Sequence, residues 1–202
     1  MKFVKFEVLI SAGRFPSSQD WRRIQSDITQ SIRTVRWPRG SGKFVLYDQP
    51  GKKRGQGSGV KPIKDAFMEV LKRKGWSLET RLPIAFREKP GPVDATLQVG
   101  DKIFALEWET GNISSSHRAL NKMALGIISN ALIGGVLVLP TRKMYHYLTD
   151  RVGNYEEIEP YFPLWRSLQC EEGLLAIGVV EHDSVSKNVP RIPKGTNGRA
   201  LV

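Results

Sequence analysis

Apolar residues recur along the chain with two periods, and the changes between them predict where strands and helices lie. A period of two is typical of strands that bury one face, and a period of three to four is typical of helices that do so. The helix expected at 61–74 has Pro62 in its first turn and Gly75 just after its end, as helices often do. In full, the pattern predicts strands at 2–10, 44–47, 76–82, 93–99, 102–109, 136–139 and 174–180, and helices at 20–35, 61–74, 115–132 and 142–151.

The order of these elements predicts the fold class. Between residues 61 and 139 it runs helix, strand, strand, strand, helix, strand, which indicates an α/β protein with a central mixed β-sheet flanked by helices on both faces. A chain of 202 residues with 40% hydrophobic content can bury one sizeable core. We therefore expect a single domain over residues 1–202, with a long basic loop at 38–60 and a basic C-terminal tail at 184–202.

Positive charge is concentrated in that loop and tail. Lysine and arginine outnumber aspartate and glutamate by 31 to 20, and the net charge is +11. From Arg33 to Lys64 there are nine basic residues against one acid, and no acid accompanies the four basic residues after Asp183. Such stretches are typical of surfaces that bind a phosphate backbone, although a solvated basic surface or attraction to an anionic membrane is the alternative. In these segments we expect nucleic-acid contacts from Lys52, Lys53, Arg54, Lys61, Lys187, Arg191 and Lys194.

Composition excludes several classes of protein. The single cysteine, Cys170, rules out an intramolecular disulfide and a metal site built from cysteines. No apolar run approaches the roughly 20 residues of a membrane span, and the start of the chain lacks the long apolar stretch of a signal peptide. The three histidines lack the spacing of zinc ligands. We therefore expect a cytoplasmic protein without a membrane partner.

The segment from 93 to 109 reads as a hairpin that carries three carboxylates. The first strand alternates so that Asp94 lies on its polar face, and the second strand places Glu107 and Glu109 on one face. With a two-residue turn at 100–101, counting back along both strands pairs Asp94 with Glu107. Directly opposed residues have Cβ atoms about 4.5 to 5.5 Å apart, so the three carboxylates should share one patch.

Carboxylates this close repel one another and need positive charge. On these strands only Lys102 is within reach. A divalent cation such as Mg²⁺ would satisfy them, because it binds a few carboxylate oxygens and keeps water and phosphate oxygens as its other ligands. The alternatives are a solvated acidic strand face, or pairing with arginines from elsewhere in the fold.

Pro-Val-Asp at 92–94 followed by Glu-Trp-Glu at 107–109 resembles the PD-(D/E)xK motif of nucleases, with glutamate in place of the usual final lysine. This glutamate resembles the variant found in BamHI, within the group of type II restriction endonucleases that includes BglII and BstYI. The helix at 61–74, followed by Gly-Trp, resembles a helix of BstYI. The resemblance covers residues 61 to 140. It implies a restriction-endonuclease-like core and a homodimeric, Mg²⁺-dependent enzyme that cuts double-stranded DNA at a short palindrome, and its relatives recognise sites with a GATC core.

The same resemblance implies roles for individual residues. Asp94 and Glu107 match the metal ligands, and Glu109 stands where lysine usually does, with the implied role of orienting or deprotonating the attacking water. Some members of the family have a further catalytic acid on the preceding helix. Glu69 is the candidate for it here, although a surface carboxylate beside two basic residues is the alternative.

His117 and Arg118 lie at the start of the helix after this motif, where backbone N–H groups could meet a DNA phosphate. A solvated first turn is the alternative reading of these two residues. Three other functions also stay open: a repair or recombination nuclease of the same fold, a glycosidase that uses two carboxylates, and a DNA-binding module without catalysis. Cleavage at a fixed palindrome would separate the restriction enzyme from all three.

Overall fold

The computed structural model describes residues 1–53, 55–82, 91–149 and 152–194. Within this part of the chain, the strands form one large mixed sheet and one small sheet. The strands are β1 (Lys2–Ala12), β2 (Val45–Tyr47), β3 (Ser77–Thr80), β4 (Val93–Val99), β5 (Lys102–Trp108), β6 (Leu132–Pro140), β7 (Gly173–Glu181) and β8 (Ser184–Ser186). The helices are η1 (Phe15–Ser17), α1 (Gln19–Thr34), α2 (Lys61–Arg73), α3 (Ile113–Ile128), α4 (Arg142–Tyr145), α5 (Tyr155–Ile158), η2 (Glu159–Tyr161) and α6 (Phe162–Arg166).

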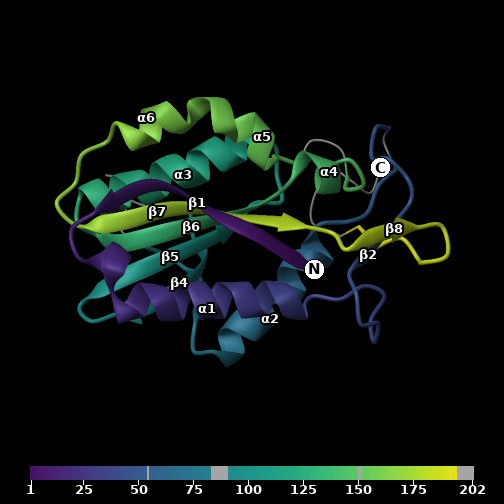
Figure 1. The fold of residues 1–202 in the computed structure, drawn as a ribbon, viewed down its shortest axis with the longest axis horizontal. Coiled ribbons are helices and arrows are strands. Elements are labelled where there is room, and N and C mark those ends of the chain that lie inside the picture. Colours follow the sequence, from purple (N-terminus) through teal and green to yellow (C-terminus); the bar gives the residue numbers. More distant parts are fainter. Residues whose placement is uncertain (54, 83–90, 150–151, 195–202) are drawn as a thin grey trace.

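The large sheet has the strand order β1-β7-β6-β5-β4-β3. Its centre, β5, β6 and β7, is parallel, whereas β4 runs antiparallel to β5, and the edge strands β1 and β3 run antiparallel to their neighbours. Helices α1 and α2 cover one face, and α3, α5 and α6 cover the other (Figure 1). The predicted fold class is therefore confirmed. None of the described helices is long and apolar enough to cross a membrane.

Each face of the sheet has its own core, which explains the alternation along β5. Phe104 and Trp108 belong to the core beneath α1 and α2, whereas Ala105 belongs to the core beneath α3. β6 is buried along its whole length because helices cover both of its faces. At Gly135 an added Cβ would lie 2.6 Å from Met123 Sδ, so the missing side chain lets α3 approach the sheet closely.

The hairpin of β4 and β5 has the predicted turn and register. Gly100 has a φ of +58°, in the left-handed region that glycine adopts without strain. Val99 faces Lys102, and the antiparallel pairing continues from there without a shift. Counted onward in this register, Asp94 becomes the neighbour of Glu107 at the carboxyl end of β5.

Of the helix expected at 142–151, only the first turn, α4, forms among the described residues, and 150–151 lie outside them. After Tyr145 the chain bonds to the long loop, where Ser58 N–H donates to Tyr147 O (2.8 Å) and Thr149 N–H donates to Ser58 O (2.9 Å). These bonds to a distant segment take the place of further helical bonds. The pattern also misses α5, η2 and α6, because each has five residues or fewer and a period of 3.6 cannot show itself over so short a stretch.

The loop at 38–60 packs against the segment that follows β7. Within the loop β2 forms as expected, and it pairs in parallel with β8. Ile192 is buried, and its carbonyl oxygen accepts a hydrogen bond from Gly59 N–H (2.9 Å). Residues 184–194 therefore belong to the fold rather than to a tail, and the remainder of the expected tail, 195–202, lies outside the described residues.

Candidate active site

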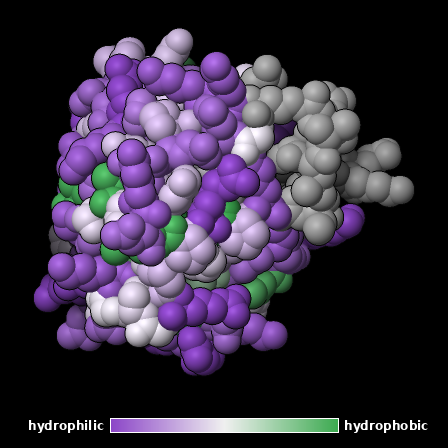
Figure 2. All heavy atoms as spheres, turned by 90° about the vertical axis from the view of Figure 1, so that its right-hand side faces the viewer, coloured by the Kyte–Doolittle hydropathy of each residue, from purple (hydrophilic) through white to green (hydrophobic). Residues whose placement is uncertain are grey.

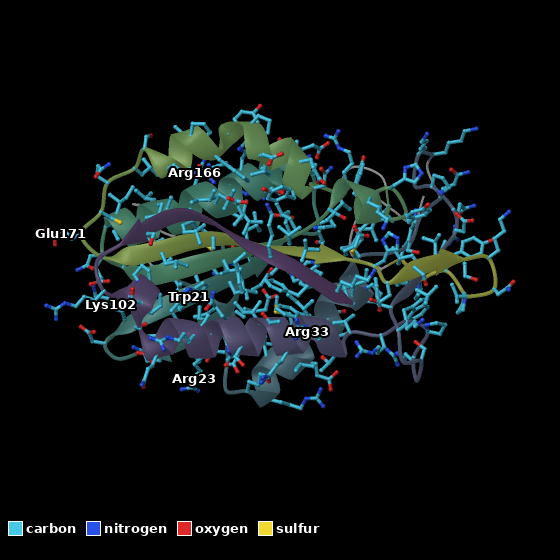
Figure 3. The ribbon with its side chains drawn as sticks, in the orientation of Figure 1. Trp21, Arg23, Arg33, Lys102, Arg166 and Glu171 are labelled. Carbon is cyan, nitrogen blue, oxygen red and sulfur yellow. The ribbon has the colours of Figure 1, made fainter. Side chains whose placement is uncertain are left out.

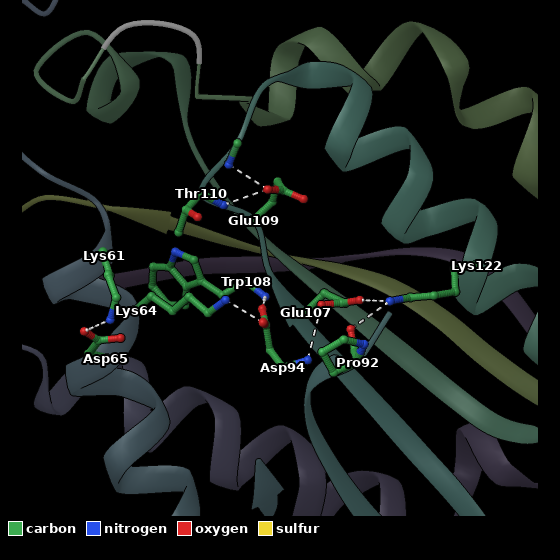
Figure 4. A network of polar contacts seen from close by, with 11 residues as sticks. Lys61, Lys64, Asp65, Pro92, Asp94, Glu107, Trp108, Glu109, Thr110 and Lys122 are labelled. Atoms are coloured by element: carbon green, nitrogen blue, oxygen red, sulfur yellow. Dashed lines mark hydrogen bonds and ion pairs between the residues drawn. The ribbon is translucent and has the colours of Figure 1, made fainter. Parts of the chain in front are cut away.

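Asp94 and Glu107 lie side by side at the carboxyl end of β5, where β4 begins (Figure 4). The backbone N–H of Asp94 donates to Glu107 Oε2 (3.3 Å), and that of Trp108 donates to Asp94 Oδ2 (2.7 Å). Each of the two acidic side chains is only 12% exposed. The carboxyl ends of parallel strands are the edge at which open α/β sheets bind their ligands. The structure thus brings two of the three candidate carboxylates together at such an edge.

Each carboxylate also pairs with a lysine from a neighbouring helix. Lys64 of α2 lies 2.5 Å from Asp94 Oδ1, and Lys122 of α3 pairs with Glu107 Oε1. The strands alone offered only Lys102, which lies at the start of β5, away from its carboxyl end (Figure 3), and donates to Asn130 Oδ1. The alternative that basic residues from elsewhere in the fold pair with these carboxylates is therefore correct, except that the partners are lysines and not arginines. No sequence signal marks these two lysines, because the packing of the helices decides which lysine reaches the sheet edge.

Burial raises the pKa of Glu107 from its ordinary value of 4.5 to about 7. The charge of Asp94 contributes to this rise, whereas Lys122 opposes it. Near neutral pH the ionised form of Glu107 is therefore held at a cost in free energy, which a further positive charge at its carboxylate would offset. Mg²⁺ is commonly held by one or two protein carboxylates, with water and phosphate oxygens completing its shell. The two donors consequently fit a hard divalent cation.

Glu109 does not join the pair. Its Oε1 accepts hydrogen bonds from the N–H groups of Thr110 (2.9 Å) and Gly111 (2.6 Å), so the side chain folds onto the turn that leads to α3 (Figure 4). The described residues contain no group of three or more histidine, cysteine, aspartate or glutamate side chains that could hold a metal ion. The expectation of three clustered carboxylates is therefore wrong, because these backbone donors hold the third one away.

Glu69 lies on α2 but not at the carboxylate pair. Its side chain is exposed. It follows Lys64 by five positions, which turns it about 140° around the helix axis from the face that meets Asp94. The structure therefore places a lysine, and not this candidate acid, where α2 approaches the site.

His117 and Arg118 have different surroundings on α3. The His117 ring packs edge-on against Tyr161, with ring centroids 4.6 Å apart, and its centroid lies 5.7 Å from that of Trp165. His117 thus fills the contact between α3 and the segment from η2 to α6, which differs from the expected place at an open helix end. Arg118 is exposed.

The other basic candidates gather around the loop and the segment after β7. Lys61, at the start of α2, pairs with Asp65 (2.6 Å), and Arg191 donates to Gly55 O in the loop (2.8 Å). The side of the molecule on which β2 and β8 lie presents a largely hydrophilic surface (Figure 1, Figure 2). Lys194 is half-buried and Arg54 lies outside the described residues. The remaining candidates are exposed: Lys52, Lys53, Lys61, Lys187 and Arg191.

A mixed sheet covered on both faces, with an acidic pair at the carboxyl edge of its central strands, defines a nuclease with the restriction-endonuclease fold. The crystal structure of restriction endonuclease BglII complexed with a DNA 16-mer has this fold. It matches 94% of this chain and 88% of its own, with a TM-score of 0.64 at 11% sequence identity.

Sequence comparison identifies the family. The family model for restriction endonuclease BamHI matches residues 1–199. The type II restriction enzyme OkrAI of Oceanobacter kriegii is 52% identical over 201 residues, which span 100% of both chains. The type II restriction enzyme BamHI of Bacillus amyloliquefaciens is 34% identical over 180 residues, which span 86% of this chain and 80% of its own. The chain therefore belongs to the BamHI restriction endonuclease family, a family of type II site-specific deoxyribonucleases that generally use divalent metal ions.

Proposed function

We propose that the protein hydrolyses phosphodiester bonds of double-stranded DNA at a short palindrome, with Mg²⁺ as its cofactor. The observation that carries this proposal is the partly buried pair of Asp94 and Glu107, with the raised pKa of Glu107. The resemblance to the BamHI, BglII and BstYI group adds a palindrome with a GATC core. Localisation in the cytoplasm, where DNA is accessible, goes with this proposal.

The mechanism assigns a task to each acidic residue. Asp94 and Glu107 would hold the cation. The N–H group of Trp108 fixes the Asp94 carboxylate in place, and the N–H group of Asp94 fixes the Glu107 carboxylate. When bound, Mg²⁺ supplies a water of lowered pKa and neutralises charge that develops on the phosphate. We assign to Glu109 the task of orienting the attacking water or accepting its proton. Its Oε1 is engaged by two backbone N–H groups, which leaves Oε2 as the oxygen for that task.

The basic loop and the segment after β7 form the proposed DNA surface. β2 and β8 tie these two segments together, and Arg191 bridges them through its bond to Gly55. Because the loop leads directly into α2, its charges lie along the chain next to the helix that supplies Lys64 to the site. Lys52, Lys53 and Lys187 are exposed there and would neutralise phosphates of the duplex.

We further propose that two copies associate through the helical layer of α3, η2 and α6. Four large apolar side chains of this layer are 41% to 58% exposed: Leu125, Ile128, Tyr161 and Leu164. Exposed apolar side chains that gather on one layer are typical of an interaction surface. A two-fold symmetric dimer would bury the same patch from each copy, and its symmetry would match that of a palindrome.

Plasmid digestion tests the proposed function. The protein is incubated with plasmid DNA in Mg²⁺ or in EDTA, and the ends of the products are sequenced. We expect discrete fragments only in Mg²⁺, with every end at one palindrome. Asp94→Asn is the matched control, since it removes a metal-binding charge but keeps the oxygen that accepts from Trp108 N–H. This variant should stay folded, as a cooperative melting transition would show, and should leave the plasmid intact.

Other outcomes of the digestion contradict the proposal in distinct ways. Ends at random positions would indicate a repair or recombination nuclease. DNA that is retarded in a gel but never cut would indicate a binding module. Cleavage that persists in EDTA would remove Mg²⁺ from the mechanism.

A further inference from the structure

All four oxygens of the Asp94 and Glu107 carboxylates have partners within the protein. Asp94 Oδ2 and Glu107 Oε2 accept backbone N–H groups, whereas Asp94 Oδ1 and Glu107 Oε1 contact the ammonium groups of Lys64 and Lys122. The lysines thus occupy the oxygens on which a metal ion would bind. They reach the carboxylates from opposite sides of the sheet, because α2 and α3 cover opposite faces (Figure 4).

These pairs differ from ordinary surface ion pairs. The side chains of Lys64 and Lys122 are 20% and 23% exposed, and each acidic partner is 12% exposed. By contrast, the ion pair of Lys61 and Asp65 on the same helix joins side chains that are 47% and 54% exposed. Charges that are partly removed from water interact more strongly than exposed ones.

Lys122 also ties down the approach to β4. Its Nζ donates to the carbonyl oxygen of Pro92 (3.3 Å), two residues before Asp94. One ammonium group therefore holds the carboxylate on β5 and the backbone that precedes β4. The four-carbon stem of a lysine is flexible, so the same ammonium group can turn away when a stronger cation takes its place.

We infer that Lys64 and Lys122 are resident counter-ions of the acidic pair, which a divalent cation displaces when it binds. This inference rests on the proposed function, which makes Asp94 and Glu107 the metal-binding residues. A divalent ion and an ammonium group compete for the same oxygen, and the lysine that stays beside a bound metal is repelled by it. Displaced ammonium groups then need an anion, and a DNA phosphate beside the metal supplies one.

The direction in which metal affinity changes distinguishes competition by the lysines from a purely structural role. If the lysines compete with metal, their removal should tighten metal binding even though it removes ion pairs. If they only hold the fold, their removal should lower stability and leave metal affinity equal or weaker. The loss of one competing pair is expected to tighten binding about tenfold, from the lower end of the coupling measured for close charge pairs.

Titration calorimetry with MgCl₂, without DNA, tests this in the full-length protein. Lys122→Met and Lys64→Met remove the charge but keep most of the apolar stem, and each should lower the Kd for Mg²⁺ about tenfold. Lys72→Met, at an exposed position on α2, is the matched control and should leave the Kd unchanged. Lys122→Arg keeps the charge and should stay near the parent value.

Thermal unfolding in EDTA accompanies the titrations. If Lys122→Met does not fold, Lys122→Gln, which keeps a donor for the Pro92 carbonyl, replaces it in the titration. An unchanged or weaker Mg²⁺ affinity in the variants at both lysines overturns the inference, as does the absence of Mg²⁺ binding in every variant. The titration does not depend on cleavage, which the plasmid digestion measures separately. A protein that shows the expected Mg²⁺ affinities but leaves the plasmid uncut would refute the proposed function and leave this inference standing.

Discussion

Glu107→Gln should stabilise the metal-free protein at alkaline pH, although it removes a residue assigned to metal binding. Burial, together with the charge of Asp94, raises the pKa of Glu107 in the folded protein from 4.5 to about 7. Keeping this carboxylate ionised therefore costs folding free energy. The difference between the two values is about 2.5 pH units, and at 1.36 kcal/mol for each unit it corresponds to roughly 3 kcal/mol.

The pH dependence has a defined sign. Between pH 4.5 and 7 the folded protein holds the proton of Glu107 more tightly than the unfolded chain does, so the stability of the parent falls as the pH rises through this window. Above the window the whole cost is present. Glutamine resembles the protonated side chain and does not titrate. The variant should therefore match the parent below this window and exceed its free energy of unfolding by up to about 3 kcal/mol above it.

Urea denaturation in EDTA at several values between pH 4 and 8, followed by tryptophan fluorescence, measures this difference. Glu181→Gln is the control of opposite sign. Burial would raise the pKa of Glu181, but the close contact with His182 and the hydrogen bond from Thr141 outweigh it and lower this pKa. Glu181→Gln should therefore destabilise the protein at neutral and alkaline pH. A gain for Glu107→Gln that is equal at every pH, or a loss at pH 8, would refute the reasoning.

Three further predictions concern catalysis, DNA binding and assembly. Glu109→Gln should slow cleavage at least about 100-fold, while DNA affinity in metal-free buffer stays equal or rises because a negative charge is lost. A cleavage assay and a gel shift measure the two effects, and weaker DNA binding would contradict the prediction. Lys187→Ala and Arg191→Ala should each lower the slope of log affinity against log salt by about one in fluorescence anisotropy, and an unchanged slope would exclude that residue from phosphate contact. Leu164→Glu should convert dimers to monomers in sedimentation velocity; a dimer that persists would place the interface elsewhere.

The sequence by itself determined the features that depend on neighbours along the chain. The alternation of β5 assigns Phe104 and Trp108 to one face and Ala105 to the other, and the structure agrees. A two-residue turn fixes the register of a hairpin, so the approach of Asp94 to Glu107 follows from counting. Side-chain period and turn length are local properties, and local properties can be read from one sequence.

Tertiary structure alone decided which charges meet the acidic pair. Lys64 is 30 residues from Asp94 along the chain, and Lys122 lies on a helix that packs on the opposite face of the sheet from α2. A helical period shows which side of a helix is apolar, but it does not show which polar side chain at the border of that side will reach a particular strand. The docking of both helices settles this.

The same limit applies to Glu109 and to the C-terminal segment. The period of two places Glu109 beside Glu107, but strand β5 ends at Trp108, and the backbone donors of the next turn take the Glu109 carboxylate. The segment from 184 to 194 has no periodic signal of its own, because it is held by β2 and Gly59 from a distant part of the chain. Hydrogen bonds between distant segments form only once the chain is folded, so one-dimensional periodicity carries no trace of them.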